Sequence, residues 1–152
     1  MKRKLCSLLL ALSVLCGASA CSYGGVRTFF SQWFGEEGVA GGYELHATET
    51  RVVIIPQGGL GEVTLLDYME RAKLNGGFDF EIQDGMITSI NGKANAADFS
   101  SCWMLYTSDV EFSNTDWGTV EYEGETLGSA IVGAEFLPAT TGAIYLWEYC
   151  TF

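Results

Sequence analysis

The chain has very little of the chemistry on which enzymes draw. It contains one histidine, His46, in 152 residues. Catalytic triads, Cys-His pairs and zinc sites need more histidine or clustered cysteine than this sequence supplies. The Gly-rich segment 57–61 lacks the Lys and Ser/Thr of a phosphate-binding loop. We therefore expect a protein that is not an enzyme. The alternative is a pair of carboxylates brought together from separate strands, which the sequence cannot reveal.

Basic residues are also scarce. The chain has eight Lys and Arg against 19 Asp and Glu, and three of the eight stand at positions 2–4. Removal of residues 1–20 leaves five basic and 19 acidic residues, a net charge of −14. Such a surface repels phosphate backbones and anionic lipid head groups. We expect no nucleic-acid partner.

The N-terminus has the three parts of an export signal. A basic start at 2–4 is followed by a mainly apolar run at 5–16 and by small residues before Cys21. The apolar run is too short to remain as a membrane-spanning helix. We therefore predict that residues 1–20 are a signal peptide and that the mature protein is extracytoplasmic.

Cys21 is a candidate lipidation site. The segment 18–21, Ala-Ser-Ala-Cys, resembles a bacterial lipobox, although Ala18 stands where Leu is usual. A lipid on Cys21 would tether the protein to the membrane, and the Gly-rich segment 21–43 would be the linker. The alternative is cleavage without acylation, which would give a secreted protein.

Two further cysteines, Cys102 and Cys150, remain once the signal is removed and Cys21 is acylated. In an oxidising compartment, such a pair is more often a disulfide than a metal site. We therefore predict a disulfide between them.

Residues 44–152 are enough for one domain. Thr64–Leu74 has an N-capping Thr, an apolar stripe at helical spacing and a stop at 75–77, so it predicts a helix. The turn signals Asp84-Gly85 and Asn91-Gly92 predict hairpins. Further strands are expected at 45–55, 78–83, 86–90, 102–106, 119–122 and 144–149. These elements predict an α+β fold, a mostly antiparallel sheet with one helix packed on one face.

Aromatic residues gather in the second half of the chain. Alternation places Trp103 on the opposite face of its strand from Tyr106, while Trp147 and Tyr149 share a face. One helix cannot cover all of these side chains. We expect some of them, together with Trp117, to form a surface that binds a planar ring, a sugar or a protein partner.

Four segments in order resemble the transcobalamin-like C-terminal domain family. The family has a TLLDAL helix start, a G-x-x-x-x-S-I-N-G hairpin, a W-M-x-Y strand and a closing G-D-x-Y-x-W-x-Y strand. The matching segments are Thr64–Met69, Gly85–Gly92, Trp103–Tyr106 and Gly142–Tyr149. The family's short turn after W-M-x-Y is replaced here by a long acidic stretch, 107–126.

The resemblance implies a small β-grasp-like fold and a ligand-binding role. In the vertebrate cobalamin carriers, a related domain covers one face of the vitamin, so the resemblance implies cobalamin or a similar planar molecule as the ligand. The resulting hypothesis is an exported, lipid-anchored binding module. The alternative is a cell-surface protein-interaction or adhesion module without a small-molecule ligand.

Overall fold

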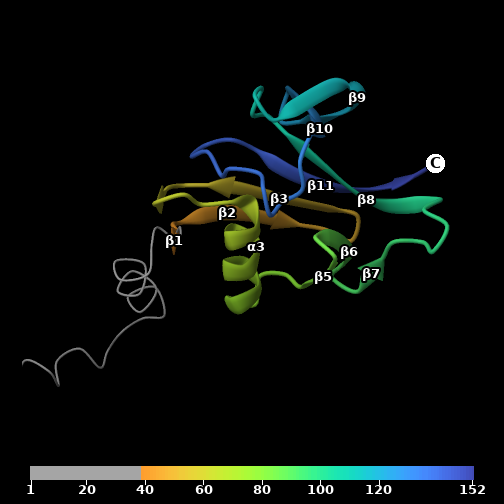
Figure 1. The fold of residues 1–152 in the computed structure, drawn as a ribbon, viewed down its shortest axis with the longest axis horizontal. Coiled ribbons are helices and arrows are strands. Elements are labelled where there is room, and N and C mark those ends of the chain that lie inside the picture. Colours follow the sequence, from red (N-terminus) through yellow and green to blue (C-terminus); the bar gives the residue numbers. More distant parts are fainter. Residues whose placement is uncertain (1–38) are drawn as a thin grey trace, which may run out of the picture. The chain divides into compact units, whose positions relative to one another are not determined.

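A six-stranded antiparallel sheet is the centre of the fold (Figure 1). The computed structural model describes residues 39–152, so the predicted signal peptide, Cys21 and most of the predicted linker lie outside the described residues. The strand order is β2-β3-β11-β8-β10-β9. The strands are β2 (Tyr43–Ala47), β3 (Arg51–Pro56), β8 (Ser101–Thr107), β9 (Ser113–Tyr122), β10 (Glu125–Ala130) and β11 (Tyr145–Thr151).

Two smaller sheets flank this centre. One has three strands in the order β5-β6-β7, and the other pairs β1 with β4. Their bounds are β1 (Val39–Ala40), β4 (Gly59–Leu60), β5 (Phe80–Gln83), β6 (Met86–Ile90) and β7 (Lys93–Ala94). Because Ala40 is buried in the core, the fold begins within the segment that the sequence assigned to the linker.

The helix forms as predicted. α3 (Leu65–Leu74) begins after the N-cap Thr64, whose hydroxyl accepts the backbone N–H of Asp67. The Asp67 carboxylate in turn accepts the Thr64 backbone N–H at 2.8 Å, which completes a capping box. Asn75 ends the helix, and Gly76 follows with φ 71°. No helix within residues 39–152 has the length and apolarity that a bilayer crossing requires.

Two of the predicted turns are also confirmed. Asp84 and Gly85 have φ values of 51° and 79°, and they join β5 to β6. Asn91 and Gly92, at 49° and 78°, join β6 to β7. Positive φ at both central residues matches the right-handed twist of a tight hairpin.

Two segments differ from the prediction. Residues 45–55 are two strands and not one, because Thr48 closes a turn by exchanging hydrogen bonds with Arg51. The acidic stretch 107–126 contains β9 and the start of β10, which pair around Glu123 and Gly124, both at positive φ. The sequence analysis found only the end of β9 and missed β10.

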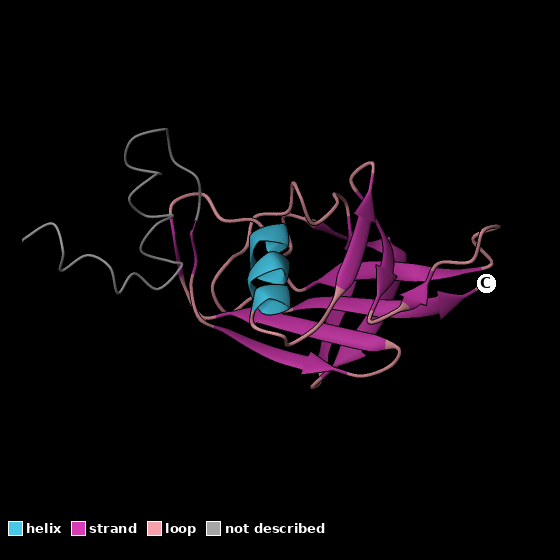
Figure 2. Ribbon diagram, turned by 90° about the horizontal axis from the view of Figure 1, so that it is seen from below, coloured by secondary structure: helices cyan, strands magenta, loops and turns pink. Residues whose placement is uncertain are grey.

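Each face of the central sheet is covered by its own cluster of apolar side chains. Helix α3 lies on one face of the sheet (Figure 2). There Leu65, Tyr68 and Met69 join Trp103 and Trp147 in the larger core. A smaller cluster occupies the other face, built around Val53, Tyr106, Leu127, Ile144 and Leu146. The predicted class, a mostly antiparallel α+β fold with the helix on one face, is therefore confirmed.

Candidate ligand-binding cleft

The five aromatic residues predicted to bind a ligand do not form one surface. Trp103 and Trp147 lie in the core on the helix side of the sheet, and Tyr149 packs partly buried against the same cluster. Tyr106 is buried on the opposite face. Trp117 is on edge strand β9 with 64% of its surface exposed. The structure therefore brings together Trp103, Trp147 and Tyr149, but places the other two elsewhere.

Trp103 and Trp147 line a cleft of about 440 Å³, called the tryptophan cleft below. It lies among the β5–β6 turn, the start of β8 and the segment that follows β10. A cleft of this size falls in the range of about 300–1,000 Å³ that is typical of small-molecule sites. Its walls are formed by Gly85, Met86, Ile87, Asn95, Phe99, Cys102, Trp103, Met104, Ala130, Ile131, Val132, Gly133, Ala134 and Trp147.

No charged side chain lines the tryptophan cleft, although the protein is strongly acidic. Its rim includes exposed apolar side chains from three separate segments. Met86, Phe99 and Ile131 are 56%, 55% and 43% exposed. Exposed apolar side chains that gather around a hollow mark an interaction site more often than scattered ones do.

Phe99 also has an unusual backbone. Its φ is 56°, in the left-handed region that bulky residues rarely occupy. Its N–H donates to the Ala96 carbonyl at 2.9 Å, which closes the turn that presents the ring. Backbone strain of this kind gathers at ligand sites. The sequence analysis did not identify Phe99, because nothing in its local pattern signals positive φ.

Both N–H groups of Trp103 have hydrogen-bond partners. Its indole Nε1–H donates to the Lys93 carbonyl at 2.7 Å, and its backbone N–H donates to Asn95 Oδ1 at 2.9 Å. Asn95 in turn donates from Nδ2 to the Ile87 carbonyl at 2.9 Å. The Asn95 side chain therefore joins β6 to β8, and its oxygen and its nitrogen each already hold one hydrogen bond.

Trp147 is different. Only 6% of the residue is exposed. Among the buried side-chain nitrogen and oxygen atoms of residues 39–152, its Nε1 alone has no hydrogen-bond partner. A buried donor without a partner costs about 1–3 kcal/mol. Trp147 also lines the tryptophan cleft, so a ligand whose acceptor reaches this buried nitrogen would satisfy the donor.

Tyr149 has a structural role. Its hydroxyl donates to the Ala94 carbonyl at 2.9 Å, and its ring meets the Trp103 ring edge-on at 5.3 Å. Lys93 Nζ lies over the same ring, 4.5 Å from its centroid. These contacts hold β7 against the ends of β8 and β11, which supports the Trp103 wall of the tryptophan cleft.

Tyr106 lies against a cysteine on the opposite face. Its hydroxyl is 3.7 Å from Cys150 Sγ. Burial, and after it the hydrogen bond with Cys150, raises the pKa of Tyr106 to about 12. This hydroxyl therefore stays protonated at neutral pH.

Cys102 and Cys150 lie directly opposite each other across β8 and β11. Both are free thiols in the structure. Burial, and after it the charge of Cys150, raises the pKa of Cys102. The strands are thus neighbours, as a disulfide would need, while the bond itself stays a prediction.

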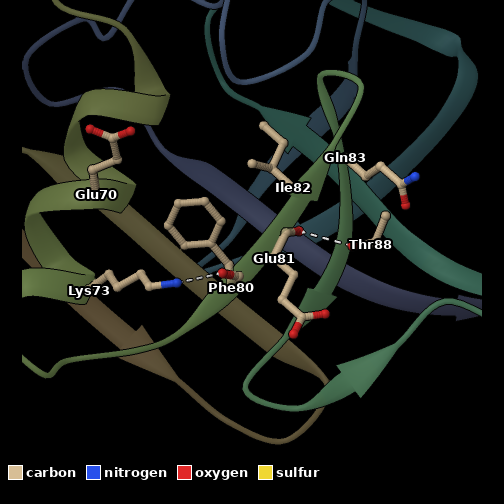
Figure 3. Close-up of a pocket in the computed structure, with 7 residues that line it drawn as sticks. All are labelled: Glu70, Lys73, Phe80, Glu81, Ile82, Gln83 and Thr88. Atoms are coloured by element: carbon tan, nitrogen blue, oxygen red, sulfur yellow. Dashed lines mark hydrogen bonds between the residues drawn. The ribbon is translucent and has the colours of Figure 1, made fainter.

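A second hollow, of about 640 Å³, lies between α3 and β5 (Figure 3). The cation at its wall, Lys73, is already engaged. Its Nζ is 2.6 Å from Asp79 Oδ1 and donates to the Phe80 carbonyl at 2.8 Å. The Lys73 hydrogen bond is also the main reason that the pKa of Asp79 is lowered. This hollow therefore offers a ligand no free cation.

Within residues 39–152, no three His, Cys, Asp or Glu side chains lie close enough together to hold a metal ion. His46 is on edge strand β2, exposed, with Nε2 4.0 Å from a Glu44 oxygen. Comparison of the chain with protein-family models, with curated proteins and with solved structures found no match.

Proposed function

We propose that the chain is a non-enzymatic binding module. In this proposal, the tryptophan cleft holds a small, flat, mainly apolar molecule that carries one hydrogen-bond acceptor. The observation that supports it is the buried Trp147 Nε1–H, which has no partner within residues 39–152. A ligand acceptor would supply the missing bond and recover part of the cost of burying that donor.

The lining of the cleft favours this ligand class. Its walls are apolar apart from Asn95 and two sulfur-containing side chains at the start of β8, and no wall residue is charged. The Asn95 side chain is already bonded to Ile87 and Trp103. A ligand rich in amides or charges would therefore lose its hydration without new partners.

Cobalamin, the ligand that the family resemblance implies, fits this cleft poorly. A corrin ring has many amide groups around its edge, and the cleft has one amide side chain, Asn95, whose oxygen and nitrogen each already hold one hydrogen bond. Its walls contain no imidazole. We therefore treat cobalamin as a separate candidate, to be tested by titration of the exported protein with cyanocobalamin.

Export and anchoring are part of the same proposal. The basic and apolar start of the chain and the small residues before Cys21 support a cleaved signal and a lipid on that cysteine. The one helix of residues 39–152, packed across a mainly antiparallel sheet, supports a β-grasp-like arrangement. An intact mass of the exported protein tests anchoring: the expected chain starts at Cys21 and carries acyl chains. A mass that retains residues 1–20 contradicts it.

Two matched probes test the binding proposal. Quinoline and naphthalene are bicyclic rings of similar size, but only quinoline has an acceptor nitrogen and neither has a donor. We expect the exported protein to bind quinoline more tightly by about 1 kcal/mol, or about fivefold, which is the contribution of one hydrogen bond. Trp147→Phe should abolish this preference, while Trp117→Phe should leave it unchanged. Equal affinity for both probes would contradict the proposal.

A protein partner is the second candidate. The observation that favours it is Trp117, which is 64% exposed on β9, and β9 is the last strand at one end of the six-stranded sheet. An exposed edge strand can accept a further strand from another chain. Recovery of an envelope protein by the wild type and by Trp147→Phe, but not by Trp117→Ala, would favour this candidate over the cleft.

A further inference from the structure

Three sulfur-containing side chains lie together where β8 meets β11. Cys102 and Met104 are two residues apart on β8, so they share a face of the sheet. Cys150 lies opposite Cys102 on β11 and packs on that same face. The Cys102 Sγ and Met104 Sδ atoms are 3.8 Å apart. All three side chains are partly exposed, so an ion can reach them from solvent.

The neighbouring pair on the two strands, Trp103 and Tyr149, shows how far apart the Cα atoms of Cys102 and Cys150 lie. The backbone N–H of Trp103 donates to Asn95, and that of Tyr149 donates to the Thr50 carbonyl, so both point away from the partner strand. The next pair along, Cys102 and Cys150, is therefore the hydrogen-bonded kind, with Cα atoms about 5.5 Å apart. At this distance two side chains on one face can reach the same ion.

The sulfur spacing suits metal coordination. With metal–sulfur bonds of about 2.3 Å, two ligands of a tetrahedral or trigonal ion are about 3.8–4.0 Å apart. The distance between Cys102 Sγ and Met104 Sδ, 3.8 Å, has this value. The nearest carboxylate on β11, Glu148, is already paired with Arg51 Nε at 2.5 Å. The Tyr106 hydroxyl, 3.7 Å from Cys150 Sγ, stays protonated at neutral pH. The remaining donors are two thiols and one thioether, the soft set that selects Cu(I) over harder ions.

We propose that Cys102, Cys150 and Met104 form a binding site for one Cu(I) ion. The ion takes two thiolates and one thioether as ligands, and both thiols release their protons as it binds. A disulfide between Cys102 and Cys150 would use the same sulfur atoms, so the oxidised protein cannot hold the ion. The Cu(I) site does not require a ligand in the tryptophan cleft, although Cys102 and Met104 also line that cleft.

The test is an anaerobic titration of the reduced, exported protein with Cu(I) buffered by the chromophoric chelator bicinchoninate. We expect one Cu(I) per chain, and X-ray absorption should show three sulfur neighbours at about 2.3 Å. Cys102→Ser and Cys150→Ser should lose the ion, and Met104→Leu should weaken binding by about tenfold or more. Oxidation of the wild type to the disulfide should abolish binding.

A control variant makes the result specific. Met86→Leu removes an exposed thioether outside the sulfur cluster and should bind Cu(I) as the wild type does. The proposal is overturned if the reduced wild type takes no Cu(I) from the chelator, or if Met104→Leu binds as tightly as the wild type. Loss of binding in Met86→Leu also overturns it. The X-ray absorption of the wild type decides the question even if a cysteine variant fails to fold.

Discussion

The Asn95 side chain accepts the Trp103 backbone N–H at 2.9 Å and thereby replaces a strand partner for β8. The same residue bonds to β6 through its own backbone N–H, which donates to the Thr88 carbonyl, and through Nδ2, which donates to the Ile87 carbonyl. Asn95 thus joins the three-stranded sheet to the central sheet, together with the bonds that Trp103 and Tyr149 donate to the Lys93 and Ala94 carbonyls. The tryptophan cleft depends on this connection for one of its walls.

Asn95→Ala should destabilise the fold by about 2–3 kcal/mol, because it leaves a partly buried donor on Trp103 and an acceptor on Ile87 without partners. The measurement is urea unfolding followed by tryptophan fluorescence. Asn75→Ala is the matched control: its side chain makes one exposed hydrogen bond, to Tyr43, and should cost about 0.5 kcal/mol or less. Equal losses in the two variants would refute the role of Asn95.

Gly41→Ala should be poorly tolerated and Gly42→Ala should be tolerated. A Cβ added at Gly41 would lie 1.6 Å from the Gly58 carbonyl oxygen, whereas one at Gly42 would have no neighbour closer than 3.5 Å. Moving the Gly58 backbone should cost about 2 kcal/mol or more. Thermal unfolding of the two variants measures the difference, and similar midpoints would show that Gly41 does not touch Gly58.

Thr64→Ala should cost about 1 kcal/mol, because it removes the hydroxyl that caps the first turn of α3. The exposed hydroxyl of Thr126, which donates to Glu121, provides a control whose loss should be close to neutral. Helical circular dichroism during urea unfolding gives both values. A Thr64→Ala variant as stable as Thr126→Ala would contradict the capping box.

Tyr145 should make the protein sensitive to alkali. Burial is the main cause that raises the pKa of this hydroxyl, which donates to the Pro138 carbonyl at 2.7 Å and accepts the Thr140 N–H at 2.8 Å. The Tyr145 hydroxyl thus has a higher pKa in the folded state than the value of 10.0 in the unfolded chain. It stabilises the fold in full below that unfolded pKa, and this contribution is lost as the pH rises through the folded pKa.

The measurement is the free energy of unfolding of the wild type and of Tyr145→Phe between about pH 8 and pH 11. At the lower pH, the variant should be less stable by about 1–2 kcal/mol, because two hydrogen bonds are lost. The difference in free energy of unfolding between the two proteins should narrow at the higher pH, where the wild type loses the contribution of this hydroxyl. A gap that stays constant with pH would show that Tyr145 titrates alike in both states.

The parts of the fold that the sequence predicted correctly are set by local chemistry. The capping box of α3 and the Asp84-Gly85 and Asn91-Gly92 turns each depend on a few consecutive residues. The turn at Thr48 was missed because it contains neither Gly nor Pro. β10 was missed because its apolar and polar residues do not alternate. Within it, Gly128 lies where a Cβ would be 3.1 Å from that of Ser113 on β9.

Local pattern could not predict the tryptophan cleft. Alternation correctly placed Trp103 and Tyr106 on opposite faces, and Trp147 and Tyr149 on one face. The cleft, however, is formed by segments that are far apart in the sequence. Its exposed rim comes from the β5–β6 turn, the loop before β8 and the segment after β10, and no periodicity links Met86, Phe99 and Ile131.

The central claim is that the Trp147 Nε1–H, which has no partner within residues 39–152, donates a hydrogen bond to the ligand. The most direct test is the ¹H–¹⁵N signal of this indole group in the exported protein, assigned through Trp147→Phe. Quinoline should shift this signal to the lower field of a hydrogen-bonded donor, and naphthalene should not. The account is contradicted if Trp147 responds to neither probe, if it responds equally to both, or if quinoline moves the exposed Trp117 signal instead.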